Sequence, residues 1–509
     1  MFLTNLLRGV YFDRFLRDSE AYTTIEGIER TQRDVLARLI AAGRKTLWGE
    51  EHHLEKVDSY EDFAATQPGP LDYSVFRPYV MRMIDGERDI LWPGVTRNFA
   101  QSSGTSDGKS KYIPVTADSF QRNHYRGASA VVAYYLKQYP DSRIFCGKSF
   151  ILGGSFANEL NTRPGVRVGD LSANLIENIN PIANMVRIPR RSIALMENWT
   201  EKLPALVNAA IGENVTNISG VPSWFMTVLK EIIHKAGAET IHDVWPNLEV
   251  FFHGGISMEP YRQQYQTLTN PAKMRYVETY NASEGFFAVQ SDREDRAMLL
   301  LLNDGTFYEF IPIEEVYTDG HDVLPAWKLE EGKIYAMVIT SCNGLWRYML
   351  GDTVKVESVA PLKITIAGRT KHYINAFGEE LMVDNADRAI AAVEQLLDCS
   401  VENYTAAPVY AGNRTRGRHQ WLIEFSRAPR DMDAFAAALD AELRRLNSDY
   451  DAKRTGNIFL DPLSVSVAPQ GLFEQWLAMT GKLGGQRKVP RLCNDRRFLD
   501  PMLKLIHKQ

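Results

Sequence analysis

Apolar residues recur at helical spacing in the first hundred residues of the chain. The positions that share one face of this expected helix are Ile28, Val35, Leu36, Leu39 and Ile40. Gly43 follows them and suits the end of a helix. We therefore expect this segment to be largely helical and to pack against the main domain.

The pattern changes from Asn98 onward, where short apolar runs alternate with helical segments. Lys111–Val115 is typical of a strand, and Thr116 is suited to cap a helix that continues to Leu136. This alternation of strands and helices predicts an α/β domain.

A polar turn near residue 370 marks the expected domain boundary. Strands predicted at Lys363–Ala367 and Tyr373–Ala376 are joined by Gly368-Arg369-Thr370-Lys371. We therefore expect a large N-terminal domain over residues 1–368 and a small C-terminal domain over residues 369–509, with a hinge near residues 367–372.

The C-terminal segment has the pattern of a small α+β unit. The expected elements are a helix capped by Asp384, strands at Tyr404–Tyr410 and Gln420–Phe425, a helix carrying Phe435, Leu439, Leu443 and Leu446, a strand at Leu463–Val467 and a helix at Gly471–Met479.

Length and charge narrow the possible functions. A chain of 509 residues with 45% hydrophobic content is expected to fold into two or three globular domains. Its 63 acidic and 58 basic residues give a net charge of -5, without a long run of one sign that could follow a phosphate backbone. Nucleic acid is therefore not an expected partner.

The sequence gives no signal for a membrane or for disulfides. Met1–Glu20 lacks the apolar core of a secretory signal, and apolar runs such as Ala128–Leu136 are shorter than the roughly 20 residues that span a bilayer. The four cysteines have no Cys-x-x-Cys spacing. We expect a cytoplasmic protein without a membrane partner, disulfides or structural zinc.

The segment most suggestive of chemistry is Ser102-Ser103-Gly104-Thr105-Ser106-Asp107-Gly108-Lys109-Ser110-Lys111. Backbone N–H groups and hydroxyls of small residues can surround phosphate oxygens, while Lys109 or Lys111 would neutralise charge. Three residues separate Gly104 from Gly108, where a Walker A loop has four, and a strand rather than a helix follows. A hairpin that clamps a triphosphate is one interpretation, and a plain surface turn is the other.

This segment resembles the nucleotide loop of the auxin-responsive acyl acid amido synthetases, a branch of the adenylate-forming superfamily that includes acyl-CoA synthetases and firefly luciferase. Arg77-Pro78-Tyr79 and Leu91-Trp92-Pro93-Gly94 are similar to the segments that precede the loop in that family. The resemblance implies that ATP is bound by Ser102, Ser103, Gly104, Thr105, Ser106, Gly108 and Lys109.

Further motifs follow in the family's order. Tyr280-Asn281-Ala282-Ser283-Glu284-Gly285 is similar to the Tyr-Gly-x-Thr-Glu motif, with Ser283 in place of threonine. The resemblance implies that Tyr280 lies against adenine, Ser283 meets the α-phosphate and Glu284 binds Mg²⁺. These residue types suit their roles, because a tyrosine ring can stack and a carboxylate is a hard oxygen ligand.

Two glycine-containing motifs flank the last one. Phe252-His253-Gly254-Gly255 resembles a turn beside the adenine in relatives, which makes Gly255 a candidate ligand, whereas His253 is expected in the core. Trp346-Arg347-Tyr348-Met349-Leu350-Gly351-Asp352 is similar to the Tyr-Arg-x-x-Gly-Asp segment of the family. Its aspartate holds the ribose hydroxyls, so Asp352 is expected to do the same.

Two basic segments resemble catalytic loops of the family. Gly368-Arg369-Thr370-Lys371 is similar to the hinge, which makes Arg369 a candidate nucleotide ligand and Lys371 a candidate catalytic residue. Gly484-Gly485-Gln486-Arg487-Lys488-Val489-Pro490-Arg491 is similar to the terminal Lys-x-Pro-Arg stretch, which makes Lys488 a second catalytic candidate. Solvated basic turns are the alternative for both segments.

The resemblance implies a fold and a reaction. The expected fold is a large adenylate-forming α/β domain of mixed sheets, helices and a small β-barrel, followed by a smaller, mobile α+β domain. The expected reaction uses ATP and Mg²⁺ to convert a carboxylic acid into an acyl-adenylate with release of pyrophosphate. The acyl group then passes to an amine such as that of an amino acid, and AMP is released.

The acid and its acceptor are not identified by any motif. Gly220-Val221-Pro222-Ser223-Trp224 resembles a family segment near the acid, so Val221, Trp224 and Phe225 are expected to line the acid pocket, with helix core as the alternative. An acyl-CoA ligase would use the same adenylate with a thiol. A nucleotide-binding regulatory protein would have the loop without acyl transfer, and a P-loop hydrolase or kinase would form ADP.

Overall fold

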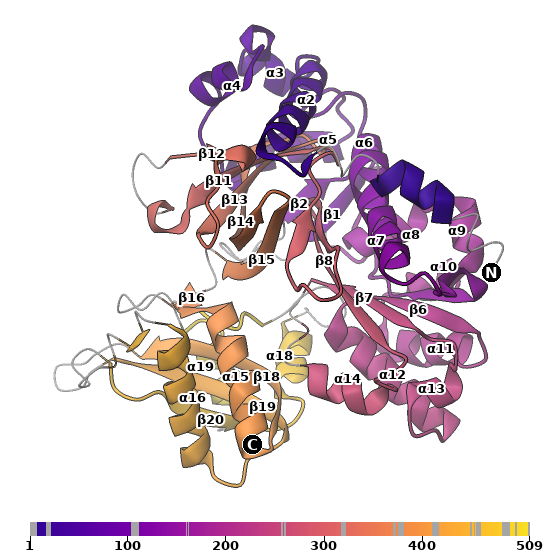
Figure 1. Cartoon of the computed structure of the whole chain (residues 1–509), viewed down its shortest axis with the longest axis vertical. Coiled ribbons are helices and arrows are strands. Elements are labelled where there is room, and N and C mark those ends of the chain that lie inside the picture. The colour runs from indigo at the N-terminus through magenta and orange to yellow at the C-terminus, as the bar shows by residue number, and fades with distance from the viewer. Residues whose placement is uncertain are drawn as a thin grey trace. The chain divides into compact units, whose positions relative to one another are not determined.

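The computed structural model describes residues 8–16, 22–102, 111–158, 160, 162–255, 258, 261–316, 322–369, 373–374, 381–409, 417–447, 450–451, 454, 460–480, 489–493 and 496–506. The packing of the chain defines two compact units, both drawn in Figure 1. The first unit comprises Met1–Ile256, Gln264–Leu350 and Val354–Thr365, and the second comprises Ser257–Gln263, Gly351–Thr353 and Ile366–Gln509.

The largest sheet in the described residues has twelve strands in the order β12-β11-β13-β14-β15-β10-β9-β8-β7-β6-β3-β5. Strands β5, β3, β6, β7 and β8 run parallel to one another, and β9 and β10 continue the sheet antiparallel. The bounds are β3 Lys148–Ile151, β5 Arg187–Ile188, β6 Val215–Gly220, β7 Val250–Gly254, β8 Arg275–Ala282, β9 Gly285–Gln290, β10 Met298–Leu300, β11 Thr306–Pro312, β12 Leu324–Pro325, β13 Ile334–Ser341, β14 Leu345–Val359 and β15 Leu362–Arg369.

Helices cover both faces of the parallel strands. In β7 neighbouring side chains point to opposite faces. The ring of Phe251 lies 5.3 Å from that of Phe225 in α12 (Pro222–Ala236), and the ring of Phe252 lies 5.5 Å from that of Tyr135 in α7 (Tyr125–Gln138). Figure 1 shows α12 beside β6 and β7. Burial on both faces explains why β7 begins as an unbroken apolar run.

The first unit contains the α-helices from α2 to α14, and the first two residues of α14 belong to the second unit. Their bounds are α2 Ile25–Gly43, α3 Leu47–Glu51, α4 Tyr60–Thr66, α5 Tyr73–Ile84, α6 Ala117–Ser119, α7 Tyr125–Gln138, α8 Leu171–Glu177, α9 Pro181–Val186, α10 Arg191–Ala194, α11 Trp199–Ala210, α12 Pro222–Ala236, α13 Ile241–Val244 and α14 Arg262–Leu268. The predicted N-terminal helix is confirmed as α2, whose expected apolar face is buried.

The helix predicted after Thr116 is present but is not continuous. Thr116 accepts a hydrogen bond from the backbone N of Ser119 and caps α6, as expected. A π-helical turn, Phe120–His124, then separates α6 from α7. Asn123 and His124 in this turn are almost fully buried, which the periodicity of the sequence did not predict.

The serine-glycine segment connects two strands of a separate sheet with the order β2-β1-β4. Strands β1 Asn98–Ser102 and β2 Lys111–Pro114 pair antiparallel, so that Ser102 lies opposite Lys111. Strand β4 Arg167–Gly169 pairs parallel with β1. The predicted strand after the loop is therefore confirmed, and it excludes the helix that a Walker A loop requires.

The second unit is the predicted α+β arrangement. Its main sheet has the order β18-β19-β20, and β16 pairs with β17. Trp421 and Ile423 of β19 pack with α15 and α16, whereas Leu422 packs with α18 and α19. The bounds are β16 Tyr373–Ile374, β17 Leu381–Met382, α15 Val383–Leu397, β18 Ser400–Val409, β19 Arg418–Arg427, α16 Met432–Leu446, β20 Ser464–Ala468, α18 Leu472–Met479 and α19 Leu499–Ile506.

One predicted helix start is wrong. Helix α15 begins at Val383 with Met382 in the capping position, so Asp384 lies inside the first turn. The side-chain oxygen of Asn385, the third residue of the helix, accepts from the backbone N of Met382 at 3.1 Å, which is the bond that the third residue makes in a capping box.

All four cysteines are free, and three of them are buried. None of the helices in the described part of the chain combines the length and apolar character needed to cross a membrane.

Glu394 should make the stability of the second unit depend on pH. Burial raises the pKa of this carboxyl from 4.5 to about 7, while its oxygen accepts a hydrogen bond from the backbone N of Val401. A raised folded-state pKa stabilises the fold below about pH 4.5, and this contribution is lost as the pH rises through 7.

Glu394→Gln keeps the acceptor but cannot ionise. We expect its free energy of unfolding to exceed that of the unmodified protein by roughly 2–3 kcal/mol at pH 8, with a smaller difference at pH 5. Urea denaturation at the two pH values measures this difference in the free energy of unfolding. An equal difference at both pH values would contradict the raised pKa of Glu394.

Candidate active site

The parallel strands of the first unit end at one edge of the sheet. The register pairs Gly220 at the end of β6 with His253, and Gly254 at the end of β7 with Thr279. Ligands of open α/β sheets bind beyond the carboxyl ends of such strands. This edge therefore carries three predicted motifs, which centre on Gly220, Gly254 and Tyr280.

The turn after β7 requires glycine for two different reasons. A Cβ on Gly254 would lie 2.5 Å from the carbonyl oxygen of Thr279, so no larger residue fits against β8. Gly255 has a φ of +77°, a conformation that glycine adopts without strain. The predicted Gly255 thus lies in a tight turn directly at the strand edge.

The motif at the end of β8 is almost fully buried. Tyr280 is 4% exposed, Ser283 4% and Glu284 7%. The ring of Tyr280 lies 5.1 Å from that of Phe287, and the carbonyl oxygen of Glu284 accepts from the side-chain amide of Asn343 at 2.9 Å. The Glu284 carboxylate is therefore held on a rigid turn between β8 and β9.

A hydrogen-bonded chain links the serine-glycine hairpin to this carboxylate. The Lys111 Nζ donates to the Tyr348 hydroxyl at 3.1 Å, and that hydroxyl donates to Oε1 of Glu284 at 3.3 Å. Lys111 is the first residue of β2, directly after the predicted phosphate loop. Tyr348 thus joins the base of the loop to Glu284, although the two lie far apart in the sequence.

Tyr73 fixes the strand that carries Lys111. Its hydroxyl accepts from the backbone N of Tyr112 at 2.7 Å and donates to the carbonyl oxygen of the same residue at 2.9 Å. Burial raises the pKa of Tyr73 to about 12, so the hydroxyl keeps its proton near neutral pH. Lys111 also lies 5.8 Å above the Tyr73 ring and 5.7 Å above the Tyr348 ring, which are cation–π distances.

Several predicted site residues lie outside the described residues. They are Ser103, Gly104, Thr105, Ser106, Gly108, Lys109, Lys371 and Lys488. The backbones of Ser102 and Arg369 end β1 and β15, but their side chains are not described. The roles expected of all these residues stay predictions.

The residues expected to line the acid pocket differ in burial. Val221 caps α12 and Trp224 lies in its first turn, and both are partly exposed. Phe225 is fully buried, and its ring lies 5.3 Å from the rings of Phe150 and Phe251. Val221 and Trp224 are therefore near the strand edge, whereas Phe225 belongs to the packed core below it.

Lys202 is a buried charge at this edge that sequence analysis missed. Its Nζ donates to the carbonyl oxygens of Gly153 at 2.7 Å and Gly154 at 3.2 Å, in the turn that follows β3. Burial lowers the pKa of this amine to about 8. No motif marks Lys202, because its partners come from a turn 48 and 49 residues earlier.

The predicted ribose ligand Asp352 belongs to the second unit and is 5% exposed. Arg347 of the same motif lies in the first unit, and so does its partner Glu309. Arg347 donates two hydrogen bonds of 3.0 Å to the buried carboxylate of Glu309. This pair satisfies both charges in the core.

The described residues after Lys488 are anchored to β18. The Thr405 hydroxyl donates to the carbonyl oxygen of Pro490 at 2.7 Å, and the backbone N of Ala406 donates to the carbonyl oxygen of Arg491 at 2.8 Å. Arg491 also forms an ion pair with Asp387 of α15. The chain that follows the predicted catalytic lysine is thus fixed to the sheet of the second unit.

The fold is that of the adenylate-forming ligases. A solved structure of GH3.15 acyl acid amido synthetase matches with a TM-score of 0.78 and 16% identity, covering 96% of this chain and 94% of that chain. A 2-hydroxyisobutyryl-CoA ligase in complex with 2-HIB-AMP matches with a TM-score of 0.60 and 11% identity, covering 95% and 92%.

The chain belongs to the GH3 family. The family's N-terminal domain matches residues 19–274, its central domain residues 299–369 and its C-terminal domain residues 384–497. The family indicated by the motifs is therefore confirmed.

Curated relatives agree with this assignment. The jasmonoyl–L-amino acid synthetase GH3.5 of Oryza sativa subsp. japonica is 22% identical, over 91% of this chain and 92% of the relative. The indole-3-acetic acid-amido synthetase GH3.3 of Arabidopsis thaliana is 22% identical, over 96% and 93%. These names confirm the predicted class of enzyme, an acid–amino acid ligase.

Tyr348→Phe should weaken nucleotide binding. It removes the hydroxyl between Lys111 and Glu284, and hydrogen bonds to charged groups contribute roughly 1.5–3 kcal/mol. We expect the Kd for ATP to rise about tenfold, which corresponds to about 1.4 kcal/mol. Calorimetric titration measures this.

Tyr308→Phe is the matched control, because Tyr308 is as buried as Tyr348 and donates to the carbonyl oxygen of Leu301. Equal ATP affinities of the two variants would contradict a role for Tyr348 at the site.

Proposed function

We propose that this protein is an ATP-dependent acyl acid amido synthetase that joins a small carboxylic acid to the amine of an amino acid. The observation that carries the proposal is the link from Lys111 through Tyr348 to Glu284 at the carboxyl edge of the parallel strands. This link joins the base of the serine-glycine hairpin, which would bind phosphates, to the Glu284 carboxylate, which would bind a metal ion. A metal-bound triphosphate requires both kinds of group.

The nucleotide would be held by residues from several motifs. The hairpin residues Ser102, Ser103, Gly104, Thr105, Ser106, Gly108 and Lys109 would surround the phosphates. Tyr280 and Gly255 would border the adenine, Ser283 would meet the α-phosphate, and Asp352 and Arg369 would hold the ribose.

Mg²⁺ would neutralise charge on the phosphates when bound. Among the described residues no three His, Cys, Asp or Glu side chains could hold a metal ion together. At a nucleotide, one or two carboxylates with phosphate oxygens and waters suffice, so Glu284 fits as the protein ligand.

In the first step an oxygen of the substrate carboxylate attacks the α-phosphorus of ATP, and the bond to the pyrophosphate oxygen breaks. The acyl-adenylate is a mixed anhydride with a good leaving group. The protein itself forms no covalent bond in this step. It contributes mainly by positioning the two reactants and by stabilising the charge that develops in the transition state. Lys111 and the hairpin would stabilise the departing pyrophosphate.

In the second step the amine attacks the acyl carbon, loses a proton and releases AMP. We propose that Lys371 and Lys488 are catalytic, and that the domain of residues 369–509 turns about a hinge near residues 367–372 between the two steps. Val221 and Trp224 would line the acid pocket, and Phe225 would support it from the packed core below. We place the reaction in the cytoplasm, where thiols such as the four free cysteines stay reduced.

Pairs of acids and amino acids should be screened for product by mass spectrometry. We expect an amide together with AMP and pyrophosphate. A thioester formed with coenzyme A instead of an amide would favour the acyl-CoA ligase, and ADP as the nucleotide product would contradict adenylation.

Glu284→Ala should lower acid-dependent exchange of labelled pyrophosphate into ATP by about 100-fold or more, because the site loses its proposed metal ligand. Ser103→Ala and Asp352→Ala should also lower it strongly. Glu294→Ala is the control, since this carboxylate is 79% exposed. Exchange by Glu284→Ala at the rate of Glu294→Ala would contradict the role of Glu284.

A further inference from the structure

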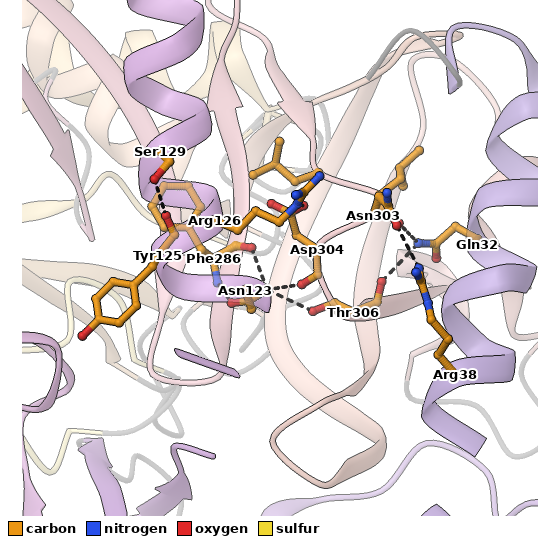
Figure 2. Close-up of polar contacts among 12 residues, drawn as sticks. Gln32, Arg38, Asn123, Tyr125, Arg126, Ser129, Phe286, Asn303, Asp304 and Thr306 are labelled. Atoms are coloured by element: carbon orange, nitrogen blue, oxygen red, sulfur yellow. Dashed lines mark hydrogen bonds and ion pairs between the residues drawn. The ribbon is translucent and has the colours of Figure 1, made fainter. Parts of the chain in front are cut away.

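Asn123 lies in the π-helical turn between α6 and α7 and is 1% exposed. Figure 2 shows its side chain among Phe286, Asp304 and Thr306. Single π-helical turns inside helices often mark functional sites. No motif of the nucleotide site includes Asn123, so its burial calls for a separate explanation.

The Asn123 amide pairs in both directions with the backbone of Phe286. Its Oδ1 accepts from the backbone N of Phe286 at 2.6 Å, and its Nδ2 donates to the carbonyl oxygen at 3.2 Å. An opposite residue in an antiparallel ladder makes the same two bonds. Asn123 thus acts as a strand partner for the residue two positions after Glu284.

The strand needs this partner because its ladder is irregular here. The pairing of β8 with β9 shifts between Tyr280↔Ala288 and Asn281↔Phe286, which leaves Phe287 as an extra residue. Bulges of this kind re-aim side chains next to active sites. A Cβ on Gly285 would lie 2.7 Å from the Phe287 ring and 3.2 Å from Oδ1 of Asn123, so the turn is closely packed.

The amide is itself held in place. Its Nδ2 also donates to the carbonyl oxygen of Asp304 at 2.8 Å and lies 3.3 Å from the Thr306 hydroxyl. Arg126 binds the Asp304 carboxylate at 2.7 Å, as Figure 2 shows. Both polar atoms of the Asn123 side chain are therefore paired, mainly with backbone groups.

We propose that Asn123 is a positioning residue for Glu284. By fixing Phe286 across the bulge, it sets the direction of the turn that carries the carboxylate, while Asn343 and Tyr348 hold its carbonyl and carboxylate oxygens. This inference rests on the proposed function, in which Glu284 is the protein ligand of the nucleotide-bound Mg²⁺.

Gln32 provides a matched control in the same network. It is fully buried in α2, its Nε2 donates to the carbonyl oxygens of Leu302 and Thr306, and its Oε1 accepts from the backbone N of Tyr308. Gln32 is thus a second buried amide that fixes backbone, but its contacts are on β11 and the loop before it.

The experiment compares Asn123→Ala with Gln32→Ala in the full-length protein. ATP affinity is measured by calorimetry over a range of Mg²⁺ concentrations, and the factor by which Mg²⁺ tightens binding is the readout. We expect the Tm of both variants to be lower than that of the unmodified protein. The factor by which Mg²⁺ tightens ATP binding should fall tenfold or more in Asn123→Ala and stay within twofold of the unmodified value in Gln32→Ala. Asn123→Ser is the second variant if Asn123→Ala does not fold, with the same criterion.

An unchanged factor in the Asn123 variant, or an equal fall in both variants, would overturn the proposal. If Mg²⁺ fails to tighten ATP binding in the unmodified protein, the metal role of Glu284 is contradicted and the inference falls with it. If Mg²⁺ tightens ATP binding equally in the unmodified protein and in Asn123→Ala, only the role of Asn123 is contradicted.

Discussion

The buried Glu284 carboxylate sets the main constraint on the first unit. A carboxylate on a residue that is 7% exposed loses most of its hydration, and this loss is tolerated when polar groups replace the water. Tyr348 supplies such a group from β14, while Asn343 in the turn before β14 and Asn123 in a helix support the neighbouring backbone. Segments distant in sequence must therefore meet at one strand edge.

The same edge explains why the functional motifs are short and scattered. Parallel strands bring the ends of β6, β7 and β8 together, so each strand can contribute one turn of a few residues. The glycines of these turns are required by packing and by backbone conformation, as Gly254 and Gly255 show. The fold supplies position, and the chemistry depends on a few side chains.

Much of this arrangement could be predicted from the sequence, because it depends on local periodicity. The apolar face of α2, the strand after the serine-glycine loop and the elements of the second unit follow directly from the pattern. The π-helical turn and the role of Asn123 could not be predicted, since its partners lie 163 to 183 residues away. The position of Phe225 could not be predicted either. The sequence does not distinguish an aromatic residue of an amphipathic helix that lines a pocket from one that packs in the core, because the difference depends on its neighbours in space.

The central claim is that the substrate carboxylate attacks the α-phosphorus of ATP. The most direct measurement supplies an acid labelled with ¹⁸O in its carboxylate and follows the label by mass spectrometry during amide synthesis. Attack at the α-phosphorus leaves one ¹⁸O atom in the AMP that is released. Label in orthophosphate, with ADP as the nucleotide product, would contradict the account.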